Sequence, residues 1–201
     1  MKKSTLRITG FILLIVASLL ISDGFYIKFK AVAAQHLLQR AWLRTVAMGK
    51  PIKPWPWADT WPVARLKVDR LGVDCIILDG DSGEVLAFGP GHITASTPPT
   101  MAGNCGLVGH RDTSFRFLKD IEKGDVLHLQ GVSGHARNYQ VVSTVVRDYR
   151  NLFIEETVTP WLTLITCYPF SGLGSTPDLR FIVFARELAV PPSHLAVSLQ
   201  Q

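Results

Sequence analysis

The feature that most constrains this chain is a succession of short apolar segments beyond residue 60, either rich in β-branched residues or alternating with polar ones. Turn-forming clusters such as Leu78–Asp81 and Gly89–Gly91 separate the segments, and a helical period is largely absent. Many short strands within one domain favour a β-barrel or a β-sandwich. The expected strands are Val63–Val68, Cys75–Leu78, Cys105–Gly109, Asp125–Gln130, Tyr139–Val146, Leu162–Cys167 and Leu179–Arg186.

The first 50 residues have a different character, and 201 residues leave room for one ordinary domain and a targeting segment. The uncharged run Ile8–Ser22 follows Lys2, Lys3 and Arg7, and the chain stays apolar through Ile27. About 20 such residues, roughly 30 Å of helix, are enough to cross a bilayer. We therefore expect a single-pass helix in the cytoplasmic membrane, with the following domain on the extracytoplasmic side.

A cleaved signal peptide is the alternative, because Ala31–Ala33 has the small-x-small pattern of a cleavage site. That segment continues into Gln35–Leu43, which has the pattern of an amphipathic helix and favours an uncleaved anchor. The proline-rich stretch Gly49–Trp57 then cannot be helical throughout. We expect residues 1–50 to form the anchor and a membrane-proximal helix, and residues 51–201 to form the globular domain.

The net charge of +5 is unevenly distributed. Residues 1–50 hold eight Lys or Arg and one acid, a net +7, whereas the remaining residues hold thirteen Lys or Arg and fifteen acids, a net −2. The basic segment suits contact with anionic membrane lipid. Because the globular part has no cationic excess for a phosphate backbone, no nucleic-acid partner is expected.

Three residue types that suit acyl transfer occur near predicted strand ends. Cys167 lies at the end of a strand, on the face opposite Leu162 and Leu164, while His110 follows one strand and Arg180 opens another. A thiol gains from a nearby imidazole, and a guanidinium can stabilise an oxyanion. Taken singly each is ambiguous, since a lone cysteine is more often a small buried apolar residue and a strand arginine a rim charge.

The remaining cysteines and histidines give no comparable signal. The chain has three cysteines, an odd number, and their spacing matches neither a disulfide scaffold nor a metal site, so no metal is expected. Solvated loop positions are expected for the other histidines, which are His36, His92, His128, His135 and His194.

These segments together resemble the sortases, the cysteine transpeptidases that join proteins to cell surfaces. Thr163–Cys167 is similar to the Thr-Leu-x-Thr-Cys signature of that family, and Gly109–Leu118 looks like its histidine segment. Arg180 lies thirteen residues after the signature cysteine, as the sortase arginine typically does. The resemblance runs from the N-terminal anchor through Trp55–Thr60 to Glu187 and is nearest to the proteobacterial sortases.

The resemblance implies an all-β, eight-stranded barrel with short helices, in which Cys167 is the nucleophile, His110 the acid and base, and Arg180 the oxyanion clamp. Thr166 matches a position lining the substrate groove, and Asp112 either stabilises its turn or orients the histidine. The implied partners are a secreted protein with an LPXTG-like C-terminal sorting signal and an amine acceptor. The signal is cleaved between Thr and Gly through a thioester. No cofactor is expected, since the sequence has no obvious calcium-binding loop.

Two alternative functions can be weighed against the same residues. An L,D-transpeptidase also uses an extracytoplasmic cysteine, but it keeps His, Gly and Cys almost contiguous, whereas His110 and Cys167 are 57 residues apart. A membrane-tethered, non-catalytic binding module on a sortase-like barrel would be marked by loss of Cys, His or Arg. All three residues are present in this chain.

Overall fold

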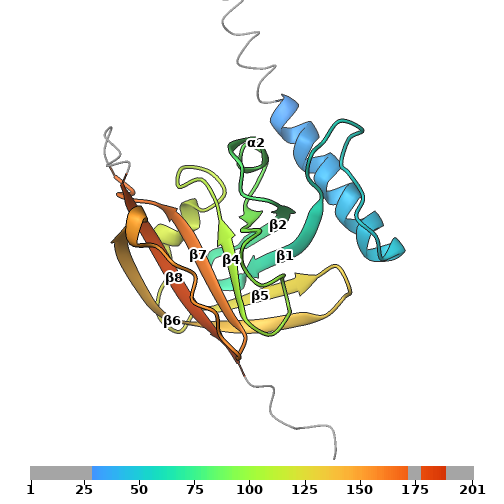
Figure 1. Cartoon of the computed structure of the whole chain (residues 1–201). Coiled ribbons are helices and arrows are strands. Elements are labelled where there is room, and N and C mark those ends of the chain that lie inside the picture. The colour runs from blue at the N-terminus through green and yellow to red at the C-terminus, as the bar shows by residue number, and fades with distance from the viewer. Residues whose placement is uncertain (1–28, 172–177, 189–201) are drawn as a thin grey trace, which may run out of the picture.

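The computed structural model describes residues 29–171 and 178–188, which form a closed β-barrel with one long helix against its outside (Figure 1). The eight strands follow the order β1-β2-β3-β4-β7-β8-β6-β5 around the barrel. The expected eight-stranded barrel is therefore confirmed. The strands are β1 (Pro62–Val68), β2 (Val73–Asp79), β3 (Gly91–His92), β4 (Asn104–Val108), β5 (Val126–Gly131), β6 (Ala136–Asp148), β7 (Trp161–Cys167) and β8 (Leu179–Glu187).

Short helical elements fill the connections between strands. The helix α2 (Gly83–Leu86) follows β2, and its first turn is capped by Ser82, whose hydroxyl accepts a hydrogen bond from the Val85 amide. Three 3-10 helices, η1 (Asp69–Leu71), η2 (Arg116–Asp120) and η3 (Tyr149–Asn151), follow β1, β4 and β6.

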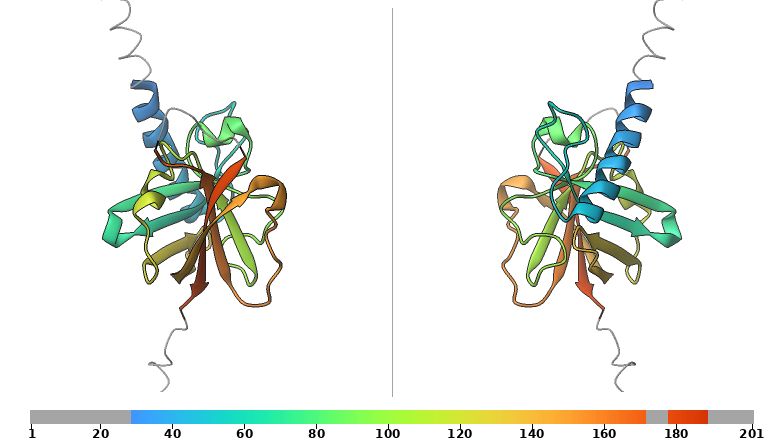
Figure 2. Two further views of the ribbon diagram at one scale, coloured as in Figure 1. Left: turned by 90° about the vertical axis from the view of Figure 1, so that its left-hand side faces the viewer. Right: turned by 90° about the vertical axis from the view of Figure 1, so that its right-hand side faces the viewer.

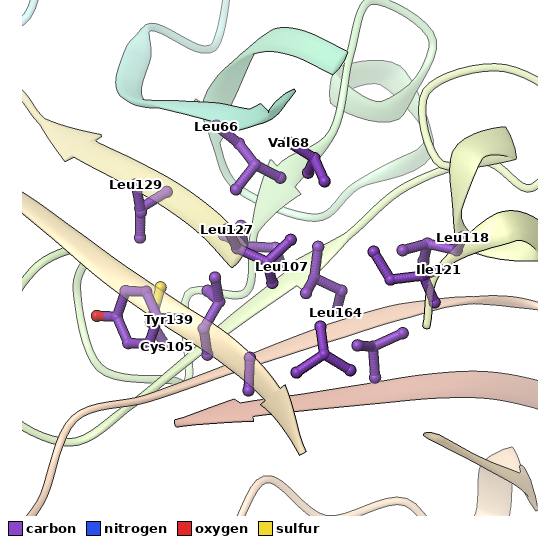
Figure 3. Close-up of a cluster of buried hydrophobic side chains, with 14 of the residues drawn as sticks. Leu66, Val68, Cys105, Leu107, Leu118, Ile121, Leu127, Leu129, Tyr139 and Leu164 are labelled. Carbon is purple, nitrogen blue, oxygen red and sulfur yellow. The ribbon is translucent and has the colours of Figure 1, made fainter. Parts of the chain in front are cut away.

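Alternation along the strands builds the interior of the barrel. Buried side chains from β1, β4, β5 and β7, among them Leu66, Leu107, Leu129 and Leu164, meet in one cluster (Figure 3). Phe115 and Leu118, from the segment after β4, close the cluster at one end. These buried side chains fix which residues of each strand face outward.

The helix formed by residues 29–48 lies along the outside of the barrel (Figure 2). Leu38 and Trp42 are almost fully buried, and together with Ile76, Leu78 and Val85 they form a second apolar cluster. The expected amphipathic helix is confirmed, and its apolar face is covered by the barrel.

The predicted membrane span, residues 8–27, lies outside the described residues. Within residues 29–171 and 178–188, no helix has both the length and the apolar character needed to cross a bilayer. The irregular segment after residue 48 agrees with the proline-rich linker expected there.

Candidate active site

Three neighbouring strands bring the predicted site residues together. Strands β4 and β7 run parallel, with Val108 opposite Ile165, and β8 runs antiparallel to β7, with Arg180 opposite Cys167. Continuing the β4 register by two residues brings His110 level with Cys167. The strand order β4-β7-β8 therefore places the cysteine between the histidine on one side and the arginine on the other.

The alternation of β7 sets the direction of the cysteine. Leu162 and Leu164 belong to the barrel interior, so Thr163, Ile165 and Cys167 face outward. The side chains of Thr163 and Ile165 are nevertheless buried, because the segment between β6 and β7 lies over them. Cys167, at the end of the strand, is only half-buried. The prediction that the cysteine is not on the leucine face is confirmed.

The backbone before His110 is held closely against β7. The Gly109 amide donates a hydrogen bond to the Ile165 carbonyl at 3.2 Å, and the Thr166 hydroxyl donates to the Gly109 carbonyl at 2.7 Å. A side chain at Gly109 would not fit, since a Cβ there would be 2.8 Å from the Phe115 ring. These contacts fix the start of the turn on which the exposed His110 lies.

Thr166 is 1% exposed, and its hydroxyl is used to hold Gly109. In this structure it joins the end of β7 to the histidine turn. Its predicted place in the wall of a substrate groove stays a prediction.

Arg180 is oriented by an aromatic ring that the sequence did not point to. Its guanidinium carbon lies 5.5 Å from the centroid of the Tyr149 ring, and its Nη1 donates to the Leu179 carbonyl at 3.0 Å. The amide of Tyr149 donates to the Asp178 carbonyl at 2.7 Å, so η3 is attached to the start of β8. Tyr149 therefore holds the arginine from the side opposite the histidine turn.

Arg111 is a second residue without a predicted role. Its Nε and Nη2 donate to the two oxygens of Asp112 at 2.8 and 2.9 Å, and its Nη1 donates to the Pro169 carbonyl at 2.6 Å. The hydrogen bonds to Asp112 raise the pKa of Arg111, and electrostatic attraction to Cys167 raises it further. Hydrogen bonding to Arg111 lowers the pKa of Asp112. Because both oxygens of Asp112 bind Arg111, the geometry favours turn stabilisation over orientation of His110.

The other two thiols lie in apolar surroundings. Cys105 is buried in the barrel beside Tyr139 (Figure 3), and Cys75 packs against the same cluster. Burial raises the pKa of each thiol to about 12. All three cysteines are free. Across the described ranges, no three His, Cys, Asp or Glu side chains lie close enough together to hold a metal ion.

Alkylation of the native protein at pH 8 is expected to modify Cys167 alone. A thiol with a pKa of about 12 is a thiolate in about one molecule in ten thousand at that pH, and the thiolate is the reactive form. Intact-mass spectrometry after iodoacetamide treatment should show one adduct, which peptide mapping should assign to Cys167. Under denaturing conditions the same reagent should give three adducts. Early modification of Cys75 or Cys105 in the native protein would contradict the expectation.

Comparison with known proteins agrees with this arrangement. The sortase domain model matches residues 66–188, and the chain belongs to the sortase family. Sortase D of Bacillus subtilis (strain 168) is 33% identical over 125 residues, which cover 61% of this chain and 62% of that protein. The proteobacterial subclass stays a prediction.

Solved structures show the same fold. A sortase D5 transpeptidase of Clostridium perfringens has a TM-score of 0.64 at 17% identity, over 78% of this chain and 99% of that one. The catalytic domain of SrtD from B. anthracis has a TM-score of 0.54 at 29% identity, over 63% of this chain and 87% of that one.

Proposed function

We propose that the protein is a cysteine transpeptidase that cleaves an LPXTG-like C-terminal sorting signal between Thr and Gly and transfers the acyl group to an amine. The observation that carries this proposal is that Arg180 lies opposite Cys167, while the turn that carries His110 is attached through Gly109 to the end of β7. These residues can then place a nucleophile, an acid and base, and a permanent cation around one carbonyl group of a bound substrate. Membership of the sortase family supports the same chemistry.

In the first half-reaction, His110 takes the thiol proton and the sulfur of Cys167 attacks the carbonyl carbon of the Thr–Gly bond. Negative charge develops on the carbonyl oxygen, where the guanidinium of Arg180 stabilises it. The C–N bond breaks as the His110 imidazolium gives its proton to the leaving glycine amine. The products are a thioester on Cys167 and a free amine.

In the second half-reaction, a neutral acceptor amine attacks the thioester carbon. His110 takes the proton that the amine loses on forming the new amide bond, and Arg180 again stabilises the oxyanion. The C–S bond breaks, the sulfur leaves as a thiolate, and proton transfer from His110 restores the starting state. No redox change or cofactor is needed.

The apolar part of a sorting signal has a suitable surface next to Cys167. Ile165 and Ile182, on the outer faces of β7 and β8, line a small space together with Leu152 and Ile154 of the β6–β7 segment. The enclosed space is only about 20 Å³. A Leu-Pro segment would therefore bind by displacing this segment from the strands.

A membrane location is the second part of the proposal. The uncharged run at Ile8–Ser22, the basic residues before it and the helix over residues 29–48 favour an uncleaved anchor with the barrel outside the cytoplasm. The alternative cleavage site, Ala31–Ala33, falls within that helix.

The decisive test is incubation of the full-length protein with a peptide containing Leu-Pro-Glu-Thr-Gly and a primary amine. Intact-mass spectrometry should show an acyl-enzyme that lacks the residues after Thr, together with a peptide product that carries the amine. A chain that forms neither product with any peptide of this class would overturn the proposal. Sedimentation of the protein with membranes, and resistance to extraction by high salt, would test the anchor separately.

A further inference from the structure

A pocket beside the histidine turn is not used by the chemistry described so far. It has a volume of about 320 Å³. It opens between the turn after β4, η2 and the segment that follows Cys167. Its lining residues are Arg111, Asp112, Arg116, Lys119 and Phe170.

The pocket is lined by close chain neighbours of the two candidate catalytic residues His110 and Cys167. Phe170 is three residues beyond Cys167, and Arg111 donates to the carbonyl of the intervening Pro169 at 2.6 Å. The ring of Phe170 is fixed by an edge-to-face contact with Phe181, with 5.1 Å between centroids. One wall of the pocket is therefore an aromatic ring that is held in place three residues beyond Cys167 in the chain.

The charge of the pocket is unbalanced. Arg111 and Asp112 neutralise each other through their two hydrogen bonds, and the Lys119 ammonium is 3.6 Å from the exposed carboxylate of Asp120. The Arg116 guanidinium is exposed and makes no direct ion pair with a described carboxylate, although it is near enough to Asp112 to help lower the pKa of that carboxyl. The lining residues thus carry three cations and one carboxylate, and Lys119 has only a weak, solvent-screened partner in Asp120.

The side on which the pocket lies indicates what it receives. Cys167 has Arg180 on its β8 side and His110 on its β4 side, and the pocket is on the β4 side. His110 exchanges a proton with the amine in both half-reactions. Whatever is covalently attached to the amine therefore lies next to this pocket. Excess positive charge disfavours an ammonium group there and favours an anionic one.

We propose that this pocket is a subsite for an anionic group, a carboxylate or a phosphate, carried by the amine acceptor of the second half-reaction. Arg116 supplies the principal contact and Lys119 a second one. The apolar stem that joins the anion to the amine lies against Phe170. This inference rests on the proposed transpeptidase function and names the class of acceptor that the site takes.

Matched pairs of acceptors test the proposal in the full-length protein. Glycine is compared with glycinamide, and O-phosphoethanolamine with ethanolamine, at equal concentrations of neutral amine and with one sorting-signal peptide. In at least one pair, the ratio of transfer to hydrolysis should be at least about threefold higher for the anionic acceptor than for the neutral one. This is the size of effect expected of solvent-exposed ion pairs. A preference for glycine alone indicates a carboxylate site, and one for O-phosphoethanolamine alone a phosphate site.

Variants identify the pocket as the source of the preference. Arg116→Gln and Lys119→Gln should bring the anionic-to-neutral ratio toward one, whereas Lys123→Gln, an exposed cation outside the pocket, should leave it unchanged. The inference is wrong if the wild-type protein shows no preference in either pair, or if the preference survives in both pocket variants.

A binding measurement separates this inference from the proposed function. N-acetylglycine, which has a carboxylate but no amine, is titrated into the full-length Cys167→Ala protein and observed by NMR, with N-acetylglycinamide as the control. Shifts confined to residues 111–119 and 170 with the carboxylate alone would support the subsite even if no peptide were cleaved. Equal shifts with both compounds, or none, would contradict it. Absence of cleavage with every acceptor would instead count against the transpeptidase.

Discussion

Cys167→Ala is expected to abolish both cleavage and transfer of a sorting-signal peptide while leaving the barrel folded. In the proposed reaction the sulfur is the atom that forms the thioester, and alanine offers no nucleophile in its place. The structural cost should be small, because Cys167 is only half-buried at the end of β7 and its strand pairing is made by the backbone. Turnover of a fluorescent peptide and a thermal melt measure the two effects.

Cys105→Ala is the control for this experiment. That thiol lies in the barrel interior, so its removal should cost stability but leave per-molecule activity of the folded protein intact. The opposite result, with activity retained in Cys167→Ala and lost in Cys105→Ala, would place the nucleophile elsewhere. Trapping with an electrophilic sorting-signal peptide should give an adduct in the wild-type protein and in Cys105→Ala only.

Arg180→Lys is expected to be almost as damaging as Arg180→Ala, with about a hundredfold loss of rate. The guanidinium is positioned by the Tyr149 ring and by its hydrogen bond to the Leu179 carbonyl. Lysine keeps the charge but loses the planar pair of donors, and removal of one oxyanion contact typically costs about 3 kcal/mol. The measurement is kcat/KM for the peptide, with a thermal melt to exclude unfolding.

A matched control is available on the same strand. Arg186→Lys makes the same substitution near the far end of β8, where Arg186 is exposed and lies opposite Trp161 rather than Cys167. Its rate should remain close to that of the wild-type protein. If Arg180→Lys kept most of the wild-type rate, charge alone would suffice and the role of a directional clamp would be withdrawn.

Most of the barrel could be predicted because alternation along a strand is visible in the sequence. Seven strands lie within a few residues of their predicted bounds. Strand β3 was missed, since Gly91 and His92 are too few to show a period and follow a proline within a turn-like cluster. The expectation of a solvated loop is wrong for His36, which lies in the helix of residues 29–48, for His128, which lies in β5, and for His92. His92 is 5% exposed, and its Nε2 lies 3.0 Å from the Thr97 carbonyl oxygen.

The residues of the candidate site could be named from the sequence, but the way in which the fold brings them together could not. The parallel pairing of β4 with β7 joins segments more than fifty residues apart, and no local pattern records it. The family resemblance, rather than alternation, placed His110 next to Cys167. Tyr149 and Arg111 had no signal, because their contacts with Arg180 and Pro169 depend on how the loops close over the strand ends.

Because the helix of residues 29–48 packs on the barrel, the part of the chain expected to fold by itself begins with this helix. Shortening the chain to residue 51, where the composition changes, would uncover the apolar surface that Leu38 and Trp42 bury on Ile76 and Leu78. Each such side chain contributes about 1.5–3 kcal/mol, and the bare face would promote self-association. Because the helix is packed on the barrel rather than connected by a flexible tether, the direction in which Cys167 faces follows the axis of this helix. Any attachment of the chain at its N-terminal side would thus also set the orientation of the candidate active site.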